Sequence, residues 1–149
     1  MQNGVKEIPR PALILGGLGL IPFLWGALCV LFPSIGNFHE QRLPLSYDGI
    51  TLLAQYGVII LSFMGGALWG FGATRGWLTL VVAVLPALWA LYAASADAAT
   101  ACLLLAPGFA LLLAADIMFT AAGLAPRWWP WLRVPLTAIV VLCLLTAAL

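Results

Sequence analysis

Residues 50–72 read ITLLAQYGVIILSFMGGALWGFG, and this run contains no aspartate, glutamate, lysine, arginine or histidine. A helix needs about 20 consecutive apolar residues to cross the hydrocarbon core of a bilayer, and this run is long enough. Hydrocarbon offers no water to a backbone amide, so a single segment that crosses it must bond its own backbone as a helix. The run therefore predicts a transmembrane helix.

The rest of the chain repeats this pattern with short connections. Of its 149 residues, 64% are hydrophobic and 7% are charged. Soluble domains carry roughly 25% charged residues, so a soluble domain and a basic nucleic-acid binder are both excluded. We expect one all-α domain, a polytopic bundle of five transmembrane helices. The predicted spans are residues 12–32, 50–72, 77–94, 98–119 and 134–149.

The basic residues of the short loops predict an orientation, because cytoplasmic loops carry an excess of lysine and arginine. Only Arg42 lies on the other side of the predicted bundle. We therefore expect the N-terminus inside and the C-terminus outside. No A-x-A cleavage site precedes Pro33, so the first span is expected to stay as an uncleaved signal-anchor. The basic residues assigned to the inner side are Lys6, Arg10, Arg75, Arg127 and Arg133.

Two sequence segments, one in each of the first two spans, resemble those of a known protein family. GGLGLIPF occupies residues 16–23 and YGVIILSFMGGALWG occupies residues 56–70, and Leu85, Pro86 and Asp116 extend the likeness over most of the chain. The sequence resembles a family of small multispanning proteins of unknown function, found in proteobacteria and mitochondria, that includes transmembrane protein 69. The resemblance implies an inner-membrane protein and supplies no catalytic residues.

Small residues form a ridge along the second span. Ser62, Gly66 and Gly70 recur every fourth residue, so they share one face of the helix, and Trp69 lies close to that face. Glycine lets helix backbones approach closely, and serine can bond across the contact. The ridge predicts either tight packing against the first and third spans or a glycine-floored groove walled by Trp69 and Tyr56.

Four side chains of the first three spans are expected at similar depth, namely Gln55, Tyr56, Trp25 and Trp89. If they converge, they form an aromatic pocket with one amide and one hydroxyl, which suits a quinone ring or the edge of a lipid headgroup. The alternative is an internal hydrogen bond between helices.

Three prolines lie near the middle of predicted spans. Each removes one backbone hydrogen bond and frees the carbonyl four residues earlier. The kinked helices would either enclose a small cavity or only shape the bundle, since membrane helices tolerate proline. The prolines are Pro22, Pro86 and Pro107, and the freed carbonyls would belong to Leu18, Val82 and Leu103.

Asp116 is the only carboxylate inside a predicted span. A charge in the membrane is costly, so such a residue is either paired or functional. An ion pair with Arg133 or Arg75 is one interpretation, and a proton-carrying or ligand-binding carboxylate is the other. His39 stands alone, and stable zinc sites need three or four protein ligands, so we predict no metal and no cofactor.

Two functions follow as hypotheses. The first is a non-enzymatic accessory or assembly subunit beside a larger inner-membrane complex, such as a respiratory complex. The alternative is a binder or carrier of a small hydrophobic molecule, a quinone or a lipid, in a cavity between the first three spans. An enzyme built on Asp116 alone is the weakest hypothesis, because acid–base work needs a second group. The expected location is the bacterial inner membrane, with lipid and other subunits as partners.

Overall fold

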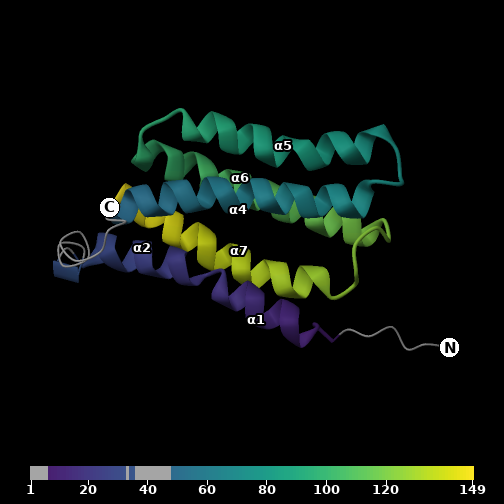
Figure 1. Ribbon diagram of the computed structural model, residues 1–149, viewed down its shortest axis with the longest axis horizontal. Coiled ribbons are helices and arrows are strands. Elements are labelled where there is room, and N and C mark those ends of the chain that lie inside the picture. Colours follow the sequence, from purple (N-terminus) through teal and green to yellow (C-terminus); the bar gives the residue numbers. More distant parts are fainter. Residues whose placement is uncertain (1–6, 33, 36–47) are drawn as a thin grey trace.

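The computed structural model describes residues 7–32, 34–35 and 48–149, and within these ranges its regular structure is entirely helical (Figure 1). Five segments are long and apolar enough to span a membrane, with α1 and α2 forming the first of them. The prediction of an all-α bundle with five spans is confirmed. The helices are α1 (Arg10–Leu18), α2 (Ile21–Leu31), α4 (Gly49–Gly72), α5 (Trp77–Ala94), α6 (Ala98–Ala121) and α7 (Trp129–Leu145), followed by the 3-10 turn η1 (Thr146–Ala148).

Helices α4 and α6 form the middle of the bundle. Helix α4 packs against α2, α5 and α6, while α6 also packs against α5 and α7, and α2 contacts α7 to close the arrangement. Consecutive spans run in alternating directions, so the α4–α5 and α6–α7 connections lie at one end and the α5–α6 connection lies at the other (Figure 1). Among the spans, α6 is the most buried, whereas α1 has no buried residue.

The topology places the described basic residues at one end. The start of α1, the α4–α5 connection and the α6–α7 connection lie together at one end of the bundle (Figure 1). Arg10, Arg75 and Arg127 belong to these three segments. A shared basic end is what the predicted orientation requires, and N-terminus inside with C-terminus outside stays a prediction.

Two helices at the opposite end begin at aspartate caps. The carboxylate Oδ1 of Asp48 accepts from the Thr51 amide at 2.6 Å, and that of Asp97 accepts from the Thr100 amide at 3.1 Å. Aspartate is a favoured N-cap residue, because its carboxylate accepts from an amide that has no partner inside the helix. Hydrogen bonds from Thr100 hold the pKa of Asp97 below its ordinary value, because they favour the ionised carboxylate.

Helix α7 begins at Trp129, earlier than the expected Val134. The reason is that Pro130 falls in its first turn, where a backbone N–H has no partner inside the helix anyway. The earlier start places Arg133 within the helix instead of in the loop.

The first span breaks at its proline, as the sequence predicted. Helix α1 ends at Leu18 and α2 begins at Ile21, directly before Pro22. The hydroxyl of Tyr56 on α4 donates to the Gly19 carbonyl inside this break at 3.1 Å. For Tyr56, the interpretation as a hydrogen bond between helices is therefore confirmed.

A second side chain bonds α6 at its proline. The indole N–H of Trp89 on α5 donates to the Leu104 carbonyl at 2.7 Å, one residue beyond the expected Leu103, in the turn before Pro107. The indole lies across the helix at Gly108, where an added Cβ would sit 2.6 Å from the Trp89 Cδ1 atom. Only glycine allows this contact without displacing the ring.

Gly108→Ala therefore lowers the stability of the protein by about 1–3 kcal/mol, the ordinary cost of overpacking a well-filled core. The matched control is Gly66→Ala, because a Cβ at Gly66 meets nothing within 4 Å. The control stays as stable as the natural sequence or gains slightly, since alanine is the better helix former. Unfolding in mixed micelles, followed by circular dichroism, measures both; equal effects would contradict the contact at Gly108.

Candidate functional site

Asp116 is completely buried in α6 and is held by two donors from α7. The Nε atom of Arg133 lies 2.8 Å from the carboxylate Oδ2, and the indole Nε1 of Trp129 lies 2.7 Å from Oδ1. The Arg133 side chain is itself only 7% exposed. The predicted intramembrane ion pair thus exists between Asp116 and Arg133, whereas Arg75 is exposed in the α4–α5 connection.

The donors reach Asp116 because they share one face of α7. Trp129, Arg133 and Thr137 follow one another at four-residue spacing, and Thr137 is buried as well. The ring of Phe71 on α4 packs edge-on against Trp129, with centroids 5.1 Å apart. We call Asp116, Trp129, Arg133 and Thr137 the polar cluster. It joins α6 to α7 where both lie against the end of α4.

Sequence reasoning missed two members of the polar cluster. Neither Trp129 nor Thr137 was among the residues expected beside Asp116. The signal was present in the spacing of Trp129, Arg133 and Thr137, but it becomes visible only when the helix is started before Arg133.

The polar cluster is neutral overall and almost closed. One carboxylate balances one guanidinium, and the pair is removed from water, so each charge depends on the other. This arrangement fixes the relative position of two helices. It supports the interpretation of Asp116 as a paired residue that holds the bundle together.

The four side chains expected to converge on one pocket are placed apart. Tyr56 is bonded to the break in the first span and packs against Phe23, with ring centroids 4.9 Å apart. Trp89 lies between α5 and α6, Gln55 is exposed on α4, and Trp25 on α2 is 39% exposed. Neither of the two cavities described below is lined by more than one of them.

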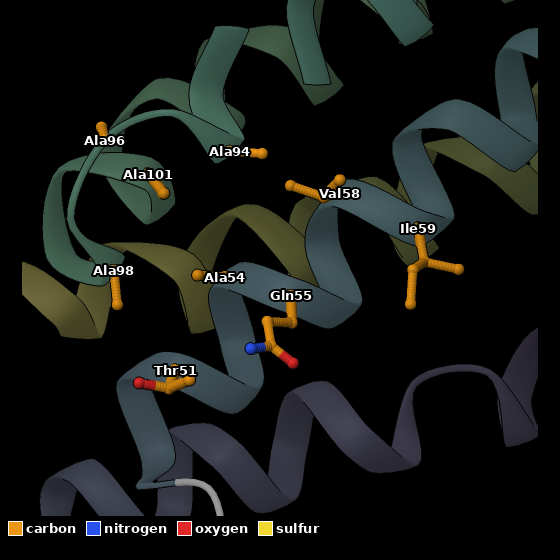
Figure 2. Close-up of a pocket in the computed structure, with 9 residues that line it drawn as sticks. All are labelled: Thr51, Ala54, Gln55, Val58, Ile59, Ala94, Ala96, Ala98 and Ala101. Atoms are coloured by element: carbon orange, nitrogen blue, oxygen red, sulfur yellow. The ribbon is translucent and has the colours of Figure 1, made fainter. Parts of the chain in front are cut away.

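The first cavity, of about 430 Å³, lies at the end of the bundle opposite the polar cluster. Its walls come from the first turns of α4, the end of α5 and the start of α6, and Gln55 is the largest polar side chain among them. Figure 2 shows the Gln55 amide on the α4 side of the cavity. The lining residues are Thr51, Ala54, Gln55, Val58, Ile59, Ala94, Ala96, Ala98 and Ala101.

The second cavity is a larger apolar groove between α5 and α6, of about 670 Å³. Trp89 and Tyr92 lie along it with ring centroids 5.9 Å apart, and the buried Leu112 forms part of its floor. We call it the α5–α6 groove. Its lining residues are Val82, Leu85, Pro86, Leu88, Trp89, Tyr92, Gly108, Leu111, Leu112, Ala114, Ala115 and Met118.

The small-residue ridge of α4 faces away from the bundle, which differs from both expectations. A Cβ at Gly66 or at Gly70 would meet nothing within 4 Å, so the ridge neither packs on the neighbouring spans nor floors a groove. Ser62 bonds its own helix, donating to the Val58 carbonyl at 2.9 Å. Trp69 on the same side is 47% exposed.

Other glycines of α4 make the close contacts inside the chain. An added Cβ would lie 2.8 Å from Leu105 Cδ1 at Gly57, 2.9 Å from the Ala83 carbonyl oxygen at Gly65, and 2.9 Å from Thr79 Cβ at Gly72. The sequence contained both sets at helical spacing. Only the packing partners separate the inward glycines from the outward ones.

His39 lies outside the described residues. Within the part of the chain that the structure describes, no three histidine, cysteine, aspartate or glutamate side chains are grouped as metal ligands would be. The three cysteines, Cys29, Cys102 and Cys143, are buried among apolar neighbours, where they pack as small hydrophobes.

These features define a multipass membrane protein whose helices are cross-linked by buried polar contacts. Residues 8–149 match the family described as Protein of unknown function (DUF3429), and the chain belongs to that family. It is also 31% identical over 150 residues to Transmembrane protein 69 of Xenopus tropicalis, an alignment that covers 95% of this chain and 55% of that protein. The chain thus spans about half the length of that relative. No solved structure matches it significantly.

Replacing Asp116 with asparagine removes one charge of the ion pair and leaves Arg133 buried without a counter-charge. We expect a loss of about 3–5 kcal/mol in stability, the usual result of breaking a buried pair from one side. The double variant Asp116→Leu with Arg133→Met removes both charges and regains most of this loss. Chemical unfolding in micelles measures the free energy of unfolding of the natural protein and of the two variants.

The control for these variants is Arg127→Gln, because Arg127 is exposed in the α6–α7 connection. Its stability should match that of the natural sequence within about 0.5 kcal/mol. If Asp116→Asn is equally harmless, the ion pair does not hold α6 and α7 together.

Proposed function

We propose that the chain is a non-enzymatic accessory or assembly subunit of the bacterial inner membrane that packs beside a larger complex, such as a respiratory complex. The observation that carries the proposal is the outward ridge of α4. A central helix of the bundle exposes Gly66 and Gly70, with Ser62 partly exposed beside them, although α4 already packs against α2, α5 and α6.

Small residues have a specific use in membrane helices. Lipid tails are as apolar as leucine, so helices associate through close packing, and glycine or serine permits that approach. Within this chain, Gly57 and Gly65 already serve that purpose, since any Cβ there would collide with a neighbour. The outward glycines offer the same geometry to a helix that this chain does not supply.

Two large side chains lie on the same face of α4 as the outward glycines, nearer to the start of the helix. Ile59 is 61% exposed and Phe63 is 69% exposed. A partner helix that lies over the glycines would also contact these two side chains. The glycines and the two side chains together support a helix–helix contact.

The polar cluster also supports a structural role for the protein. Asp116 is fully engaged by Arg133 and Trp129, so the one carboxylate inside a span is already used to hold the bundle. The name of the relative, Transmembrane protein 69, assigns no activity.

Native electrophoresis in mild detergent tests the subunit proposal. The natural protein should migrate in a band far above its own mass of 15.8 kDa, and Gly66→Leu with Gly70→Leu should release it to a small species. Bulky side chains at these positions keep a second helix from approaching.

Gly17→Leu is the control, because Gly17 is also exposed on a helix, and a Cβ there meets nothing within 4 Å. This variant should keep the large band. A natural protein that runs alone, or as a small homo-oligomer, would sink the proposal, as would a double variant that still enters the large band.

A second candidate function rests on the α5–α6 groove. We propose as the alternative that a small hydrophobic molecule, a lipid or a quinone, occupies this groove in place of the expected cavity between the first three spans. Its walls are rigid, because Trp89 is fixed by its bond to Leu104 and crosses α6 at Gly108. An aromatic and aliphatic lining of this kind suits an isoprenoid or acyl chain.

Native mass spectrometry in mild detergent tests the alternative. Ala115→Trp fills the groove from α6 and should abolish any retained small molecule, whereas Ala110→Trp on the same helix, outside the lining, should not. If the natural protein carries no small molecule, or if both variants behave alike, the groove is only a surface feature wetted by bulk lipid.

A further inference from the structure

Two polar atoms of the polar cluster are buried without a hydrogen-bond partner among the residues that the structure describes. They are the Nη2 atom of Arg133 and the hydroxyl oxygen of Thr137. Both residues are more than nine-tenths buried, at 6% and 3% exposure. Buried polar groups in folded proteins are nearly always bonded, and the environment of a membrane-spanning helix makes an unbonded one especially costly.

The geometry at Asp116 explains why Arg133 has a nitrogen to spare. A guanidinium usually gives a carboxylate two parallel N–H bonds, one to each oxygen. Here Trp129 donates to Oδ1, while Arg133 donates to Oδ2 through Nε alone. The second nitrogen of the fork is therefore available to another acceptor beside the ion pair.

Thr137 extends the same polar face by one helical turn. It follows Arg133 by four residues on α7, so the two side chains lie one above the other on the face that is packed into the bundle. The hydroxyl can both donate and accept, while Nη2 can only donate. One group that accepts from Nη2 and bonds Thr137 would satisfy both atoms.

We propose that Arg133 and Thr137 bind a buried water molecule that completes the hydrogen bonding of the polar cluster. The ligand must be small, because the site is almost closed, and it must be neutral, because Asp116 already balances Arg133. It must also accept from Nη2 and bond the Thr137 hydroxyl. Water meets these three conditions, and buried waters typically serve groups that the protein leaves unbonded.

Water can reach the site because the site lies near one end of the bundle. Arg133 lies about 6 Å along the helix from the start of α7 at Trp129, close to the end of the bundle, and its side chain keeps 7% of its surface exposed. The bound water therefore solvates the ion pair from inside the protein, and the guanidinium needs no second carboxylate.

Thr137→Val tests the site by the sign of its effect on thermal stability in detergent. Valine keeps the shape of threonine and removes the hydroxyl. If water bridges Thr137 and Arg133, the variant leaves Nη2 of Arg133 without its full hydrogen bonding. The midpoint of thermal unfolding then falls by about 2–4 °C. If the hydroxyl has no partner and the site is dry, removing it leaves the midpoint unchanged or raises it, and the proposal is overturned.

Two further variants control for the substitution itself. Thr137→Ser keeps a hydroxyl and should retain more of the stability than valine does. Thr120→Val on α6 removes a hydroxyl that donates to the Asp116 carbonyl of its own helix at 2.9 Å, and it should change the midpoint little. A loss at Thr120 as large as that at Thr137 counts against the bridge.

A second measurement works on the natural protein and does not depend on any variant folding. X-ray radiolysis generates hydroxyl radicals from bound water, and these oxidise adjacent side chains. Trp129, in the polar cluster, should be oxidised by radicals from slowly exchanging water, while Trp77, which is 87% exposed, reports bulk water. Labelling with heavy-oxygen water separates the two sources. If Trp129 carries only bulk oxygen, or if native mass spectrometry finds a heavier molecule held by Arg133 and Thr137, the proposal fails.

Discussion

The structure depends on one constraint: a polar group inside a lipid-spanning bundle must find its partner in protein, since hydrocarbon provides none. Two prolines inside spans, Pro22 and Pro107, show how the chain meets it. The hydroxyl of Tyr56 reaches a carbonyl in the break of the first span, and the indole of Trp89 reaches one beside Pro107. In both cases a side chain from another helix donates a hydrogen bond to a backbone carbonyl that precedes the proline. The backbone before each proline thereby becomes an attachment point between spans, with α4 tied to the break in the first span and α5 tied to α6.

The polar cluster applies the same constraint to a full charge. Asp116 costs least when both its oxygens are engaged, and α7 supplies both donors from consecutive turns. The polar cluster is thus bonded inside the bundle. The outward ridge of α4 takes no part in it, so the ridge can serve a different purpose. The contacts that hold the bundle together and the ridge proposed to contact a partner therefore lie on different faces. A subunit that must keep its own shape while it associates with a larger assembly needs this separation.

The sequence predicted the elements that follow from composition and length. Uncharged runs such as residues 50–72 specify spans, and Asp97 before an apolar run specifies a helix start. An ion pair was one of its two interpretations of Asp116. It could not choose between Arg133 and Arg75, because that choice depends on whether α7 begins before or after Pro130. It could not orient the α4 glycines either, because helical spacing fixes which residues share a face and leaves open what lies opposite.

Burial is graded along the chain, and this has a consequence for motion. Helix α1 has no buried residue, while half of the apolar window of α6 is buried, and the break at Gly19 separates α1 from α2. The free energy of local opening follows such differences in packing. Amide protons of α1 should therefore exchange with solvent long before those of α6, and the terminal half-helix can pivot while the remaining spans keep their register. The protein would enter its unfolding pathway at that half-helix, with the α6 region as the last part to lose protection.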